Sequence, residues 1–126
     1  MTYPGMPSVF YGDERGIKGI VEKDYRNPMI WDDISDELSD FYKTVIALRN
    51  NEEVLRHGKY EVGKVNKDDY LFIFRRFSDD KEINVYLNMS DADRRIDEGS
   101  DIGMVLLQEG LEDGILSPGG YAVIKK

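Results

Sequence analysis

The stretch TYPGMPSVFYGDERG, residues 2–16, places a short apolar run between turn-forming residues and a polar loop. The apolar run is Val9–Tyr11, and two acids, Asp13 and Glu14, follow it between glycines. A short apolar run bounded by proline and glycine is typical of a buried strand. Such a strand needs neighbours on both sides, yet the next strand-like run comes much later in the chain. We therefore expect residues 5–12 to form a strand that is separated from its sheet.

The composition is that of a folded protein of about one domain. The 126 residues are 40% hydrophobic and 11% aromatic, and they carry a net charge of −8. A surface with acids along the whole chain is repelled by nucleic acid and by anionic membranes, so neither is expected as a partner. No apolar run approaches the roughly 20 residues of a membrane span, and we expect a cytoplasmic location.

Cysteine is missing from the chain, and histidine occurs once, at His57. Disulfides, cysteine-ligated metals and Ser/His/Asp triads are therefore not expected. Acids lie at short spacing in residues 91–101, but the glycine that a calcium loop needs at its sixth position is not there, so a solvated turn is the better interpretation. The sequence predicts no metal and no cofactor.

One strong helix is predicted over residues 34–50. Apolar residues recur there at the spacing of one face of an α-helix. They are Leu38, Phe41, Tyr42, Val45 and Leu48. Asp33 or Ser35 can cap the start of this helix, and Asn50–Asn51 can end it. We expect the apolar face to dock on the region that follows.

Residues 52–126 are predicted to be all-β. Runs rich in aromatic and β-branched residues predict strands at 59–65, 70–77, 82–89, 103–108 and 121–126. SPGG, residues 117–120, predicts a turn before the last strand. Short strands at this spacing favour an antiparallel β-sandwich. The predicted fold class is therefore mainly β, with one strand–loop–helix unit in front of the sandwich.

An ordered set of motif residues runs through the first region. Its members are Gly5, Pro7, Tyr11, Gly12, Asp13, Glu14, Arg26, Pro28, Met29 and Trp31. This set resembles the eighth barrel strand and its loop in the alpha-amylase superfamily of glycoside hydrolases, in particular its neopullulanase and cyclomaltodextrinase-like branch. VIALR, residues 45–49, is similar to the last barrel helix of that family, and the terminal SPGGYAVI to its C-terminal domain.

The resemblance implies a parent enzyme that acts on α-glucans with retention of configuration, on an eight-stranded β/α barrel. Its three catalytic carboxylates would lie on the fourth, fifth and seventh strands, and all three would precede Met1. Residues 1–51 would be the last βα unit of the barrel, and residues 52–126 the C-terminal β-sandwich domain. The chain alone is expected to be inactive and to serve a structural or accessory role.

Glu14 and Arg26 are candidates for contacting the α-glucan in the intact parent, because the resemblance places their loop at the mouth of strand eight. The alternative for both residues is that they hold the loop in place. A retaining glycosidase needs two carboxyl groups about 5 to 5.5 Å apart, and the adjacent Asp13 and Glu14 would point to opposite faces of an extended segment. Trp31 is expected to pack rather than to stack on a sugar ring.

Two further alternatives stay open. Four aromatic residues of the β region, Tyr60, Tyr70, Phe72 and Phe74, could form a glucan-binding platform, although a place in the core is favoured for them. The chain could accordingly be a free-standing carbohydrate-binding β-module. The strand at residues 5–12 also predicts a homodimer, because an exposed apolar edge favours pairing with a second chain.

Overall fold

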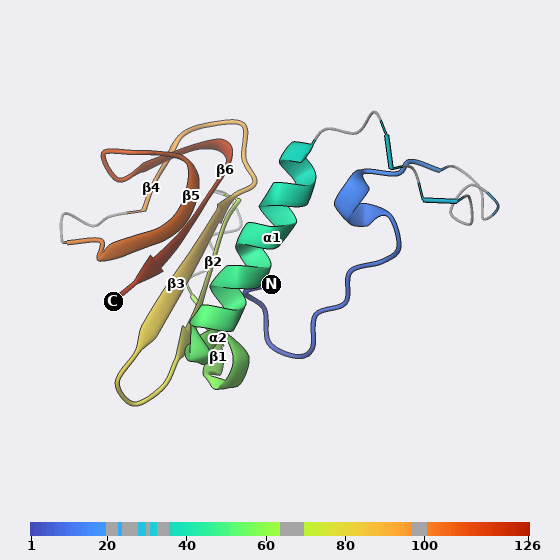
Figure 1. The fold of residues 1–126 in the computed structure, drawn as a ribbon. Helices are drawn as coiled ribbons and strands as arrows, with labels where there is room; N and C mark the ends of the chain where they lie inside the picture. The colour runs from blue at the N-terminus through green and yellow to red at the C-terminus, as the bar shows by residue number, and fades with distance from the viewer. Residues whose placement is uncertain (20–22, 24–27, 30, 33–35, 64–69, 97–100) are drawn as a thin grey trace.

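The structure is a computed structural model that describes residues 1–19, 23, 28–29, 31–32, 36–63, 70–96 and 101–126. Its elements, in chain order, are the 3-10 helix η1 (Asp13–Arg15), helices α1 (Asp36–Asn51) and α2 (Glu53–His57), and strands β1 (Lys59–Val62), β2 (Leu71–Phe77), β3 (Glu82–Asn88), β4 (Arg94–Arg95), β5 (Met104–Glu112) and β6 (Ile115–Lys125). In the view of Figure 1, α1 lies between the β-strands and the N-terminal segment.

The strands form one antiparallel sheet that curls over itself (Figure 1). The order is β1-β2-β3-β6-β4, and β5 pairs with β6 as well. The long strand β6 joins the parts of this sheet, because its end pairs with β3 while its beginning pairs with β4. The prediction of a mainly β, antiparallel domain is confirmed.

The predicted turn at residues 117–120 is wrong, because these residues lie within β6. Gly119 has a φ of 73°, and a Cβ on Gly120 would lie 2.8 Å from the carbonyl oxygen of Glu109. Glycines therefore let the strand bend and approach β5 closely at an irregularity in the pairing, where the register shifts between Glu109 and Leu111. The chain reverses instead at Asp113 and Gly114, which both have positive φ, as a two-residue hairpin turn requires.

Helix α1 confirms the helix predicted over residues 34–50, but α2 was not predicted. Glu52 separates the two helices, because its φ of −103° and ψ of 99° are extended. Val54 and Leu55 of α2 are buried in the main core, together with Phe74 and other residues of the sheet. The short helix thus closes one end of the sheet and contributes directly to the core.

The predicted apolar face of α1 is only partly covered. Phe41 contacts the ring of Tyr121 edge-on at a centroid distance of 5.9 Å, yet it is 41% exposed. The buried side chains of α1 are instead those of Ser39 and Arg49. The helix therefore docks through polar groups as well as through partly buried apolar side chains, of which Leu48 packs against the main core.

The strand predicted at residues 5–12 is also wrong. Within the described part of the chain, this segment pairs with no strand of the sheet, and Phe10 is 62% exposed. A strand forms only where a neighbouring strand completes its backbone hydrogen bonds, and the described sheet gives this segment no such neighbour.

Among the described helices, none is long and apolar enough to cross a membrane.

Candidate functional site

The loop that carries Glu14 is fastened to the start of α1. Glu14 lies in the middle of η1, between two glycines with positive φ. The Ser39 hydroxyl of α1 donates a 2.8 Å hydrogen bond to the main-chain carbonyl of Glu14. Arg15 donates to the Ser39 hydroxyl at 3.3 Å and to the carbonyl of Trp31 at 3.1 Å. The position of Glu14 is thus set through its main chain, which leaves its carboxylate out of these contacts.

Of the predicted site residues, the structure describes Glu14 and Trp31 but not Arg26. It places Glu14 in η1, but Arg26 lies outside the described residues, so the structure does not show whether the two come together. The packing expected for Trp31 is not found, because its side chain is 76% exposed. The loop that carries these residues therefore presents an exposed aromatic side chain beside α1.

The aromatic residues of the β region belong mostly to the core. Phe74 is 2% exposed, and the rings of Tyr60 and Phe72 each lie 5.6 Å from its ring. Tyr70 is 66% exposed, has a positive φ and lies at the start of β2. The core interpretation is therefore confirmed for these three residues, and Tyr70 takes no part in a shared platform with them.

A cleft of about 450 Å³ separates the N-terminal segment, α1 and the sheet. Its walls are mostly apolar and include Val9 of the segment, Phe41 and Val45 of α1, and Val85, Leu107 and Tyr121 of the sheet. Asp13 has the one charged side chain among the described residues that line it, and Met1, which carries the amino terminus, lines it as well. A cleft with so few polar groups suits apolar side chains better than sugar hydroxyls.

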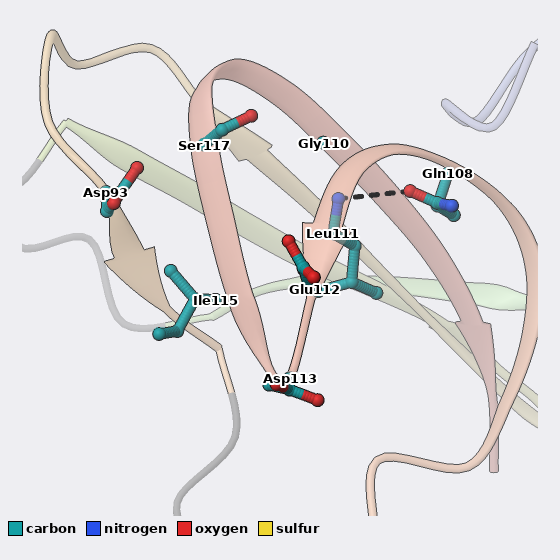
Figure 2. Close-up of a pocket in the computed structure, with 8 residues that line it drawn as sticks. All are labelled: Asp93, Gln108, Gly110, Leu111, Glu112, Asp113, Ile115 and Ser117. Carbon is teal, nitrogen blue, oxygen red and sulfur yellow. Dashed lines mark hydrogen bonds between the residues drawn. The ribbon is translucent and has the colours of Figure 1, made fainter.

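A second, more open cleft of about 700 Å³ lies on the β5–β6 hairpin (Figure 2). Three acids line it, Asp93, Glu112 and Asp113, and the side-chain oxygen of Gln108 accepts a 3.0 Å hydrogen bond from the amide of Leu111. In the part of the chain that is described, no three histidines or acids converge as metal ligands. This cleft is an open, acidic surface between the β5–β6 hairpin and the start of β4.

Two buried arginines were missed in the sequence. Arg49 is 8% exposed and Arg76 is 1% exposed. Burial and the nearby charge of Arg49 lower the pKa of the Arg76 guanidinium. A signal was present, because Arg49 falls four residues after Val45 on the apolar helix face, and Arg76 follows Phe74 on the buried strand face.

Comparisons with known proteins give relatives but no matching family model. Neopullulanase 2 from Thermoactinomyces vulgaris is 38% identical over 90 residues, which are 70% of this chain and 15% of the relative. An amylopullulanase from Thermoanaerobacterium saccharolyticum is 36% identical over 106 residues, 76% of this chain and 8% of the relative. A cyclomaltodextrinase from Thermoanaerobacter pseudethanolicus is 37% identical over 95 residues, 71% of this chain and 16% of the relative. The chain therefore spans only a small part of each relative.

The comparison with solved structures finds the same kind of enzyme as the comparison of sequences. The maltogenic amylase from S. marinus superimposes with a TM-score of 0.76 at 27% identity, over 93% of this chain and 16% of that chain. The debranching enzyme of Nostoc punctiforme has the same fold over 99% of this chain and 29% of that chain, with a TM-score of 0.78 and 23% identity. In sequence and in fold, the chain belongs to the alpha-amylase superfamily of glycoside hydrolases, of whose members it spans one part.

Proposed function

We propose that this chain is the C-terminal portion of a glycosidase that acts on α-glucans, with residues 1–51 as the last βα unit of its barrel and residues 52–126 as its C-terminal β domain. The observation that carries the proposal is the match to a neopullulanase, an amylopullulanase and a cyclomaltodextrinase over 90 to 106 residues each. The ordered motif from Gly5 to Trp31 and the antiparallel sheet support the same assignment.

The role of the chain is structural, and the isolated chain is inactive. Retaining glycosidases use two carboxyl groups on either side of the bond to be broken. The resemblance assigns the catalytic carboxylates to barrel strands that this chain does not contain. In the part of the chain that is described, two of the three acids that line the open cleft lie on the β5–β6 hairpin and Asp93 directly precedes β4, whereas Glu14 lies in η1 beside the start of α1.

Hydrolysis of maltooligosaccharides, pullulan and cyclodextrin by the purified chain tests this role. We expect no turnover above background. Turnover that Glu14→Gln abolishes, and that Glu53→Gln on the exposed surface of α2 leaves intact, would overturn the inactive role while leaving the family membership untouched.

Glu14 and Arg26 are proposed to contact the α-glucan in the intact parent. Support for Glu14 comes from η1, where the hydrogen bond from Ser39 fixes the main chain and leaves the carboxylate available. In an intact enzyme that contains this segment, Glu14→Gln or Arg26→Gln should raise KM for a maltooligosaccharide. Equal KM values for these variants and for Glu53→Gln would show that the two residues only hold the loop.

The N-terminal segment is proposed to mediate a homodimer of the isolated chain. Its support is a group of exposed apolar side chains, since Met6 is 96%, Phe10 62% and Tyr11 47% exposed. Light scattering should give a dimer mass for the chain at high concentration and a monomer mass for Phe10→Asp. Monomer masses for both proteins would contradict the dimer.

A further inference from the structure

Residues 1–5 lie against the last turn of α1, where Arg49 binds their main chain. The Nη1 of Arg49 donates hydrogen bonds to the carbonyl of Met1 at 2.6 Å and to that of Tyr3 at 3.0 Å. Its Nη2 donates to the carbonyl of Gly5 at 2.6 Å. One guanidinium thus holds three carbonyls of a five-residue segment, which uses the forked donor geometry that distinguishes arginine.

Arg76 of β2 holds the same segment from the other side. Its Nη1 donates to the carbonyl of Thr2 at 3.0 Å and to that of Leu55 at 2.8 Å. The remaining donors bond to the carbonyls of Gly58 and Lys59, just beyond the end of α2. The carbonyl of Leu55 lies in the last turn of α2, where carbonyls carry partial negative charge, which helps to keep a buried guanidinium charged and oriented.

The side chain of Tyr3 packs into a slot formed by the rings of Tyr60 and Phe74. The ring of Tyr3 contacts Tyr60 edge-on at 5.0 Å and Phe74 at 5.7 Å. The Tyr60 hydroxyl donates a 3.2 Å hydrogen bond to the Tyr3 hydroxyl. The next residue, Pro4, favours an extended conformation at Tyr3 and has no N–H to satisfy. The segment is thus recognised by four carbonyls and one aromatic ring.

The partners recorded for the two guanidiniums, within the described residues, are all carbonyls. Charged donors make stronger hydrogen bonds to carbonyls than neutral donors do, and a buried guanidinium that loses its acceptors is costly. Because main-chain carbonyls occur in any peptide, this arrangement can bind a segment that is not covalently joined to the rest of the chain.

We infer that the groove between α1 and β2, formed by Arg49, Arg76 and the slot of Tyr60 and Phe74, is a binding site for an extended peptide segment. In this structure the occupant is residues 1–5 of the chain itself. The ligand class is an extended peptide with a tyrosine at its third position and free main-chain carbonyls around it. This site fastens the N-terminal segment to both α1 and the sheet, and the inference does not depend on the proposed function.

Cutting the folded chain tests the site. A protease recognition sequence inserted after Met6, whose side chain is 96% exposed, allows the full chain to be cleaved after folding. A synthetic peptide of residues 1–6 with a fluorescent label on the Met6 side is then titrated into the cleaved protein, and anisotropy reports binding. We expect saturable binding, displacement by the unlabelled peptide, and at least tenfold weaker binding of the Tyr3→Ala peptide.

Matched variants of the protein distinguish specific binding at this site from non-specific binding of the peptide. Arg49→Met should weaken peptide binding at least tenfold, whereas Arg56→Met, at an exposed arginine of α2, should not change it. If cleavage unfolds the protein, circular dichroism with added peptide replaces anisotropy, and recovery of structure supports the site. Failure of the peptide to bind or to restore structure at millimolar concentration overturns the inference, as do equal affinities for Arg49→Met and Arg56→Met.

Discussion

The hydroxyl of Ser39 donates a hydrogen bond of 2.8 Å to the main-chain carbonyl of Glu14, across 25 residues of sequence. This bond joins the first turns of α1 to the loop that carries the proposed glucan contact. Arg15 strengthens the junction, because it also bonds to Ser39 and lies 3.7 Å from the carboxylate of Asp36. The orientation of the loop therefore depends on a small polar side chain rather than on apolar packing.

Replacing Ser39 by alanine should loosen this junction. The carbonyl of Glu14 and the guanidinium of Arg15 each lose a partner, so we expect the free energy of unfolding to fall by about 1 kcal/mol. Urea denaturation measures the change. Thr44→Ala is the matched control, because its hydroxyl bonds only to the exposed carbonyl of Asp40 within α1. Equal losses for the two variants would show that the bond to Glu14 stabilises nothing.

Asn88 should be far more sensitive to substitution. Its side-chain amide is buried and donates hydrogen bonds of 2.8 to 2.9 Å to the carbonyls of Ala92, Leu116 and Ser117. Asn88→Ala takes this donor from three carbonyls, of which that of Ala92 keeps the bond from the Ser90 hydroxyl, so we expect a loss on the order of 3 kcal/mol in the free energy of unfolding. Asn84→Ala, which removes one half-buried bond to Glu82, should cost less than about 1 kcal/mol. A loss at Asn88 no larger than that at Asn84 would contradict this account.

The sequence pattern was enough to predict helix α1 and strands β2 and β3, whereas the longest strand, β6, was predicted only over its last residues. Helix α1 and strand β3 repeat apolar residues at the period of their own structure, and β2 is marked by a run of aromatic and aliphatic residues, so each carries its own signal. Helix α2 has only five residues, which is too short for a 3.6-residue period to be recognised. Its position is decided by the burial of Val54 and Leu55 against the sheet, which only the tertiary structure shows.

The parts of the site that could not be predicted depend on long-range polar contacts. Arg49 and Arg76 lie on apolar faces, yet the sequence does not reveal that the acceptors of Arg49, and one acceptor of Arg76, are carbonyls of residues 1–5. The apolar run Val9–Tyr11 carries the composition of a strand, but pairing needs a neighbour that composition cannot supply. The motif residues of the loop pointed to the family, whereas the contact between Ser39 and Glu14 appears only once the chain is folded.

Core truncations should show that α2 contributes more per residue than the exposed half of α1. Leu55 is fully buried, so Leu55→Ala should lower the free energy of unfolding by about 2 to 5 kcal/mol. Phe41 keeps 41% of its surface exposed and makes one edge contact with Tyr121, so Phe41→Ala should cost only about 1 to 2 kcal/mol. Thermal and urea unfolding compare the two variants. A larger loss for Phe41→Ala would mean that the cleft beside α1 is closed in solution.

The free amino terminus should make stability depend on pH. Burial, and then the charge of Arg49, lower the pKa of the Met1 amino group from its usual 8.0. The folded chain therefore releases this proton at a lower pH than the unfolded chain does. Between the lowered pKa and 8.0, the unfolded chain holds more protons, so stability rises with pH across this window and stops changing above it. Below the lowered pKa, the cost of the buried charge is present in full.

Urea midpoints measured between about pH 6 and about pH 9 test this linkage, because the window includes the usual pKa of an amino terminus. We expect the midpoint of the chain to rise with pH toward 8.0. The same chain with an acetylated amino group has no charge to lose there, so its midpoint should lack this rise and lie higher at the acidic end. Every other ionisable group is common to the two proteins, so its contribution cancels in the comparison. Parallel pH profiles for the two proteins would show that neither burial nor the charge of Arg49 lowers the pKa of the terminus in the folded chain, and would place the first residue away from the carbonyl contacts of the groove.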